Sequence, residues 1–175
     1  NVTYIATICD DPALQPKMPQ VIISSERGVT ARQAATLNGG FPVNVVLIRR
    51  KSAWNQIEVM KQYLKTFCRL LGIEVRRNRF IIFILDAARI HIEASVIKLF
   101  RKAGINVIVV PARLTWLLQP LDTHGFATFK HSLRSRYQMA RSKNLLGDIS
   151  VEEFIRVLVV TIRQHMNGKQ WANAF

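Results

Sequence analysis

Two uninterrupted apolar runs constrain the fold of this chain more than any other feature of its sequence. The first covers residues 80–85 and ends at Asp86, and the second covers residues 105–110 and ends at a proline. Runs without polar alternation are typical of parallel strands that are buried on both faces. The stretch Ile92–Ala103 between them has helical spacing and is followed by a glycine. A strand, a helix and a second parallel strand in this order predict an α/β fold.

The other predicted elements come from changes in the period of the apolar residues. The β-branched runs Val2–Ile8 and Gln20–Ser24 indicate a hairpin-type pair of strands. Residues 26–42 hold three glycines and a proline with little periodicity, so we expect a loop there. The remaining predicted elements are a strand at Val43–Ile48, helices over residues 55–72 and 126–140, and a last helix that begins at a capping box of Ser150 and Glu153.

The balance of charge points to an anionic partner. The chain has 25 Lys and Arg against 11 Asp and Glu, which gives a net charge of +14. Such a surface binds phosphate backbones through counterion release, and it would also fit an anionic membrane surface. No apolar run reaches the roughly 18 residues of a membrane-spanning helix. Cys9 and Cys68 are too few for a disulfide framework, so a reducing compartment is the default.

Basic residues follow the helical spacing of two predicted helices. On the first helix they form a stripe at every fourth position, and on the second no acidic residue accompanies them. Such a stripe is either a solvated face or a contact surface for nucleic acid. The basic residues concerned are Lys61, Lys65 and Arg69 on the first helix, and Lys130, Arg134, Arg136, Arg141 and Lys143 on the second.

The length of 175 residues predicts one domain with a small appendage. We expect the main domain over residues 1–146 and a C-terminal helix and tail over residues 147–175. The wide apolar surface of that last helix indicates packing on the core or on a partner. Trp171 lies in the tail, and the sequence assigns it no role.

Two acidic residues stand where predicted strands or loops meet helices. Asp86 directly follows the first apolar run, and Asp122 opens the second basic helix after a proline. Ligands of open α/β sheets gather at the carboxyl ends of the strands, and an unpaired carboxylate beside an apolar strand is costly unless a metal or cation compensates it. The alternative is that Asp122 only caps its helix and that Asp86 is only a turn residue.

Around these acids stand Phe83-Ile84-Leu85-Asp86 with His91 five residues on, and the Leu-Gln-Pro-Leu-Asp stretch that ends at Asp122 and precedes Phe126. These two motifs resemble the catalytic domain of mariner/pogo-type DDE transposases, the DDE superfamily of endonucleases. Between the two acids lie 35 residues, which also fits the family. The resemblance covers roughly Val2 to Tyr137, and the Leu-Gln-Pro-Leu-Asp stretch is its most specific part.

The resemblance implies an RNase H-like fold, a mixed sheet with helices on both faces. It also implies phosphoryl transfer on DNA in transposition, in which three carboxylates hold two Mg²⁺ or Mn²⁺ ions. Asp86 matches the second catalytic and metal-binding acid, and Asp122 matches the third. His91 matches the family's histidine, which would orient neighbouring groups or contact DNA, or it is a structural hydrogen-bonded histidine. The resemblance also implies a location in the nucleus and a homodimer, since transposases of this family usually act as dimers there.

The chain also departs from the family's pattern. Position 87 is Ala where the family usually has Asn, and Arg89 stands in a stretch that is commonly small or Pro. The first acid belongs to a first, central strand, which the family has ahead of the strand that matches Val2–Ile8. We expect residues upstream of Asn1 to supply that strand and its Asp. If they do, Val2–Ile8 does not pair directly with the run over residues 80–85.

Three functions remain open at this stage. The first is a DDE-type endonuclease or strand-transfer domain, inactive without the first acid. The second is a domesticated or degenerate transposase domain that binds DNA or a protein without catalysis, and the third is an unrelated α/β domain with basic helices. Trp116 is the aromatic residue best placed to contact DNA, because it precedes Asp122 in the same loop. For both Trp116 and Trp54, however, packing in the core or a loop is the expected role.

Overall fold

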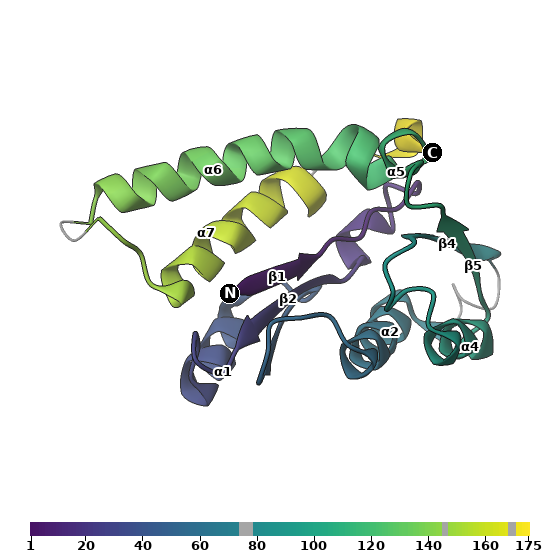
Figure 1. Cartoon of the computed structure of the whole chain (residues 1–175), viewed down its shortest axis with the longest axis horizontal. Helices are drawn as coiled ribbons and strands as arrows, with labels where there is room; N and C mark the ends of the chain where they lie inside the picture. Colours follow the sequence, from purple (N-terminus) through teal and green to yellow (C-terminus); the bar gives the residue numbers. More distant parts are fainter. Residues whose placement is uncertain (74–78, 145–146, 168–170) are drawn as a thin grey trace.

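The computed structural model describes residues 1–73, 79–144, 147–167 and 171–175, and it has two small sheets with helices around them (Figure 1). In the first sheet the strand order is β1-β2-β3. Strand β1 (Val2–Ile5) pairs antiparallel with β2 (Gln20–Ser25), and β2 pairs in parallel with β3 (Val45–Arg50). The predicted strand pair and third strand are confirmed, although β1 ends earlier than expected.

The second sheet confirms the predicted strand, helix and strand. Strands β4 (Ile81–Asp86) and β5 (Ile105–Val110) are parallel, with Ile81 opposite Ile105 and Asp86 opposite Val110. The helix between them is α4 (Ala94–Lys102). In the described part of the chain β1 and β4 each end their sheet and do not pair with each other. The chain is therefore α/β with mixed pairing and flanking helices, which is compatible with an RNase H-like fold.

The prediction of a loop over residues 26–42 is wrong, because helix α1 (Ala31–Gly40) lies there. A capping box starts the helix: the Thr30 hydroxyl accepts the Gln33 amide at 3.2 Å, and the Gln33 side chain accepts the Thr30 amide at 2.9 Å. Ala34 and Leu37 on its inner face are buried. The two glycines that suggested a loop stand only at its last turn.

Helix α2 (Ile57–Leu71) fits its prediction and covers one face of both sheets. Its buried face joins side chains from β2, β4 and α4 in one apolar cluster. Phe83 of β4 is central there, since its ring contacts Phe67 edge-on at a centroid distance of 4.9 Å and Phe100 at 5.2 Å. Phe83 thereby ties the second sheet to the helix layer.

The opposite face of the first sheet carries α6 (Phe126–Ser142) and α7 (Val151–Ile162), which lie side by side (Figure 1). The Ser150 hydroxyl accepts the Glu153 amide at 3.1 Å, as expected of this N-cap. Tyr4 of β1 stacks on Phe129 of α6 at 5.3 Å. The short elements are η1 (Gln15–Lys17), α5 (Thr115–Leu118), η2 (Leu121–Gly125), η3 (Arg163–Asn167) and η4 (Ala172–Ala174).

The C-terminal region packs on the main body. Ile155, Leu158 and Ile162 of α7 are buried in the same cluster as β2 and β3, which confirms the predicted packing of this helix on the core. Trp171, to which the sequence assigned no role, is buried beside them and donates from its indole nitrogen to the Met166 carbonyl at 3.2 Å. The expected domain boundary at residue 146 falls beside residues 145–146, which lie outside the described residues.

The prediction that β4 and β5 are buried on both faces is wrong. Ile82 is 47% exposed and Ile108 is 51% exposed. Both strands contribute alternate side chains to the cluster under α2 and α4, while the side chains that point the other way remain open to solvent. Trp54 and Trp116 do not pack in the core, since these side chains are 75% and 69% exposed. The alternative of packing in a loop fits Trp116, whose indole nitrogen donates to the Arg113 carbonyl at 3.0 Å.

Neither cysteine forms a disulfide, and burial raises the pKa of Cys9 to about 11. Among the described helices we find none that is long and apolar enough to span a membrane.

We predict that alkaline pH destabilises the fold through Tyr63. Burial raises the pKa of Tyr63 above its ordinary value of 10.0, although the Thr7 hydroxyl contacts its oxygen at 2.8 Å. Below pH 10 the buried neutral Tyr63 leaves the free energy of unfolding at its full value. As the pH rises above 10, the free energy of unfolding falls by about 1.4 kcal/mol per pH unit for each such tyrosine. In urea unfolding between roughly pH 9.5 and 11.5, Tyr63→Phe should therefore give a flatter decline than the wild type. Equal slopes would contradict this prediction.

Candidate functional site

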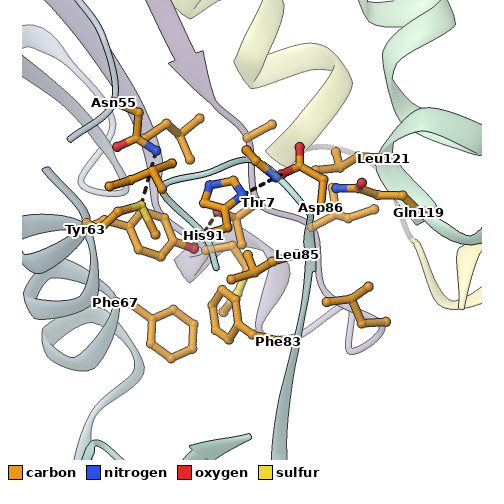
Figure 2. A pocket seen from close by; sticks show the side chains of 18 of the residues that line it. Thr7, Asn55, Tyr63, Phe67, Phe83, Leu85, Asp86, His91, Gln119 and Leu121 are labelled. Atoms are coloured by element: carbon orange, nitrogen blue, oxygen red, sulfur yellow. Dashed lines mark hydrogen bonds and ion pairs between the residues drawn. The ribbon is translucent and has the colours of Figure 1, made fainter. Parts of the chain in front are cut away.

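A cavity of about 1390 Å³ lies between the β1 edge of the first sheet and the β4 edge of the second. Its walls are the chain segments Thr3–Asp10 and Arg79–Asp86, and its floor includes Met60, Tyr63 and Phe67 of α2. Figure 2 shows Tyr63, Phe67 and Phe83 below the polar groups of Asp86 and His91. The cavity therefore has an apolar base and a polar rim at the carboxyl end of β4.

Buried glutamines hold the wall that follows β1 in place. The Gln20 amide nitrogen donates to the Thr7 carbonyl at 2.7 Å, and the Gln15 side-chain oxygen accepts the Cys9 amide at 2.6 Å. Gln15 also donates to the Met166 carbonyl at 3.0 Å. These bonds satisfy backbone groups beyond the last residue of β1, so this wall stays extended without a strand partner.

Asp86 is fixed by two contacts to one of its oxygens. Its Oδ1 accepts the Ala88 amide at 3.0 Å and lies 2.6 Å from Nδ1 of His91 (Figure 2). The His91 side chain is mostly buried, whereas that of Asp86 is partly exposed at the cavity. Because both contacts use Oδ1, Oδ2 is the oxygen that can face a ligand. This contact fits both the orienting role and the structural, hydrogen-bonded role expected for His91.

Asp122 lies next to this site without lining it. Gln119, Pro120 and Leu121 border the cavity, and Figure 2 shows Gln119 and Leu121 beside Asp86. Asp122 follows in the first turn of η2, where its side chain is exposed and is absent from the described cavity lining. The structure therefore brings the two sequence blocks together, with Asp86 inside the cavity and Asp122 on the neighbouring surface.

The described residues do not complete a site for a divalent metal. No group of three or more His, Cys, Asp or Glu side chains that could hold a metal ion occurs among them. Hard cations such as Mg²⁺ take six oxygen ligands, and a two-ion centre needs carboxylates that bridge both ions. Asp10 also borders the cavity. The neighbouring Asp11 carboxylate accepts hydrogen bonds from the Ala13 amide and from Arg79, and these bonds lower the pKa of Asp11.

The predicted basic residues lie on two surfaces. Lys61, Lys65 and Arg69 are exposed on α2, on one side of the first sheet, and the basic residues of α6 lie on the other side. Lys61 pairs with Glu58 at 2.8 Å. The two stripes therefore do not form one continuous surface around the cavity.

Within α6 the basic side chains have different surroundings. Arg141 donates to the Gly147 carbonyl at 2.5 Å, and Arg136 donates to Gln164, so both hold the helix to its neighbours. Lys130 lies over the Phe126 ring at 5.1 Å. Arg134 and Lys143 are exposed and have no partner among the described residues. Those two side chains are the most accessible cations of this helix.

Two polar residues of the cavity were not singled out from the sequence. The side-chain oxygens of Gln119 and Asn55 are buried and have no hydrogen-bond partner among the described residues. Gln119 belongs to the Leu-Gln-Pro-Leu-Asp stretch, which is the signal that pointed to this region, whereas nothing in the sequence marked Asn55. An unsatisfied buried acceptor is costly, so each is a position where a ligand donor would fit.

Comparison with known proteins supplies a family match over most of the chain. A family model described as DDE superfamily endonuclease matches residues 4–171. No curated protein and no solved structure matches the chain.

We predict that the neutral imidazole of His91 carries its proton on Nδ1. The Asp86 carboxylate accepts that proton in a hydrogen bond, and a bond to a charged acceptor favours this tautomer by about tenfold or more. Nitrogen chemical shifts of the labelled ring measure the tautomer directly. Asp86→Ala should abolish the preference, and a ring that is protonated on Nε2 in the wild type would contradict the assignment.

Proposed function

The chain belongs to the DDE superfamily of endonucleases, and on that basis we propose that it binds DNA and contributes Asp86 and Asp122 to a phosphoryl-transfer centre. The observation that carries the proposal is the Asp86 carboxylate, which His91 holds at the carboxyl end of β4 beside the Leu-Gln-Pro-Leu-Asp stretch. Ligand sites of α/β sheets gather at this end of the strands. DNA is the substrate that the family implies.

Divalent metal is the cofactor that the family generally uses. Bound Mg²⁺ or Mn²⁺ would activate the attacking oxygen and stabilise the leaving oxygen. We propose Asp86 and Asp122 as ligands, and His91 as a positioning residue that acts through Asp86. Because the described residues do not complete the ligand set, these carboxylates alone are expected to bind metal weakly and to support no cleavage.

The DNA contacts that we propose are electrostatic. The net charge of +14 favours a phosphate backbone, and the exposed Arg134 and Lys143 of α6 are the strongest candidates. Lys65, Arg69 and Trp116 are further candidates, since all three side chains are exposed. The other basic residues are weaker candidates because they already have partners. Lys130 lies over the Phe126 ring and Lys61 pairs with Glu58. Arg136 and Arg141 mainly hold α6 in place.

A second candidate function is binding of DNA or of a protein without catalysis. It is favoured by the metal ligand set, which the described residues leave incomplete, and by Ala87, where the family usually has Asn. A nuclear location and a homodimer are proposals that rest on the resemblance alone.

We predict that the chain does not nick DNA. Supercoiled plasmid incubated with the protein and Mg²⁺, and separately with Mn²⁺, should stay supercoiled, because two carboxylates leave each ion short of ligands. The test variant is Asp86→Asn, which keeps an acceptor for the Ala88 amide. Its matched control is Asp148→Asn, at an exposed position away from the cavity. Nicking that Asp86→Asn abolishes and Asp148→Asn preserves would show a complete centre and contradict this expectation.

We predict that DNA affinity falls steeply with salt. Each neutralised phosphate contributes roughly one unit to the slope of log K against log salt. Replacement of Arg134 and Lys143 by Gln should weaken binding of unrelated duplexes alike and reduce the slope by about one unit per residue that contacts a phosphate. Lys98→Gln, at an exposed position on α4, is the matched control. Affinity that does not change between low and physiological salt would refute electrostatic binding.

A further inference from the structure

We propose that helix α5 is a platform on which unpaired bases of DNA stack, a proposal that rests on the proposed function and adds to it a preferred form of substrate. None of the four residues of α5 is buried. Trp116, Leu117 and Leu118 follow one another there, and each of these side chains is more than half exposed. Large apolar side chains that are exposed together mark a contact surface.

The backbone around α5 is held by its own hydrogen bonds. The Leu114 amide donates to the Pro111 carbonyl at 2.9 Å, and the Leu118 amide donates to the Leu114 carbonyl at 2.9 Å. The Gln119 amide donates to the Thr115 carbonyl at 3.0 Å. The apolar side chains thus stand on a preformed turn, and a preformed surface loses little conformational entropy when a ligand covers it.

The hydrogen bond of the Trp116 indole determines what its ring can recognise. Its Nε1 donates to the Arg113 carbonyl at 3.0 Å, and this nitrogen carries the only polar hydrogen of the side chain. The exposed ring therefore offers its flat faces and no donor for reading a base edge. Aromatic faces stack on bases of any sequence, so the contact that fits this ring is stacking.

The charge around α5 selects nucleic acid as the occupant. Between positions 87 and 143, a stretch that includes α5, the chain has ten Lys and Arg and two acidic residues. Arg113 stands directly before the apolar turn, and its side chain is exposed. Nucleotides combine flat apolar bases with anionic phosphates, so they match both the apolar side chains and the cations around them.

The position of α5 indicates which bases it meets. The helix contacts η2 at the start of α6 (Figure 1), and Gln119 and Leu121, which follow it, lie beside Asp86 at the cavity rim (Figure 2). Bases inside a duplex are already stacked on both sides, and inserting a side chain between them costs free energy. The platform therefore meets bases that are unpaired, close to the phosphate on which the proposed centre acts.

Affinities for two DNAs test the preference without divalent metal. The probes are a fluorescein-labelled duplex and the same duplex with a central run of about four thymine–thymine mismatches, and the readout is the anisotropy of the full chain with each. The mismatched DNA should bind about fivefold or more tightly, which is the worth of one stacked base. Salt-dependent binding without this preference would overturn the platform alone, whereas no binding of either DNA would overturn the proposed function as well.

Variants of Trp116 assign the preference to α5. Trp116→Ala should abolish it and leave the affinity for the paired duplex and the Tm unchanged, because the side chain is exposed. Trp116→Phe keeps an aromatic face and should retain most of the preference. Trp54→Ala removes an equally exposed tryptophan outside α5 and is the matched control. A preference that survives Trp116→Ala, or that Trp54→Ala abolishes equally, would overturn the assignment.

Tryptophan emission reports the contact directly. The chain has three tryptophans, and Trp54→Phe leaves Trp116 and the buried Trp171. Because stacked bases quench indole emission, saturation with the mismatched DNA should lower the emission of this variant. A second change, Trp116→Phe, should remove that loss. Equal quenching after both changes would place the contact elsewhere and overturn the proposal.

A second copy of the chain is the other occupant that the experiment must distinguish. Sedimentation of the free protein gives its mass, which should be the same for the wild type and Trp116→Ala, since DNA is the partner of α5. A wild-type dimer that Trp116→Ala dissociates would make α5 a contact between copies and would overturn the proposal.

Discussion

The unpaired edges of β1 and β4 are the constraint on which the rest of the structure depends. Backbone amides and carbonyls must be paired or solvated, and in the described sheets β1 and β4 each pair along one edge only. The chain compensates locally, because Gln20 and Gln15 satisfy the backbone beyond β1 and α2 packs under both sheets. What remains is a cavity bordered by two backbone edges, with Asp86 at the end of one of them.

The position of Asp86 follows from this arrangement. Phe83 anchors β4 to α2 and α4 through its ring contacts, and three residues later the same strand delivers the carboxylate to the cavity rim. His91 then restrains one oxygen and leaves the other available. The Leu-Gln-Pro-Leu-Asp stretch brings Gln119 and Leu121 to the same rim and carries Asp122 just outside it. The family's two acids are thus near one cavity, but they do not form a metal centre with a third described side chain.

The sequence predicted those parts of the fold that a strong periodic signal determines. Strands β4 and β5, the helix α4 between them, the helix α2 and the Ser150 cap were all predicted correctly, because the apolar period and the capping residues agree there. Helix α1 was missed, since its apolar face is only Ala34 and Leu37 and its capping box replaces periodicity as the signal. The exposure of Ile82 and Ile108 could not be predicted, because an apolar run reports that a strand suits burial and not that a layer covers it. For the same reason, local sequence motifs identified the site residues, whereas the open strand edges beside them become visible only in the assembled sheets.

The most direct test of this account is whether β1 and β4 are separated in solution. Paired strands lie about 4.8 Å apart, whereas β1 and β4 belong to different sheets and border a cavity. Backbone nuclear Overhauser effects in the labelled protein distinguish the two arrangements. We predict cross-strand effects between Val2–Ile5 and Val21–Ser24 and between Ile81–Asp86 and Ile105–Val110, with none between the first and third of these segments. Cross-strand effects between Val2–Ile5 and Ile81–Asp86 would show one closed sheet and contradict the account.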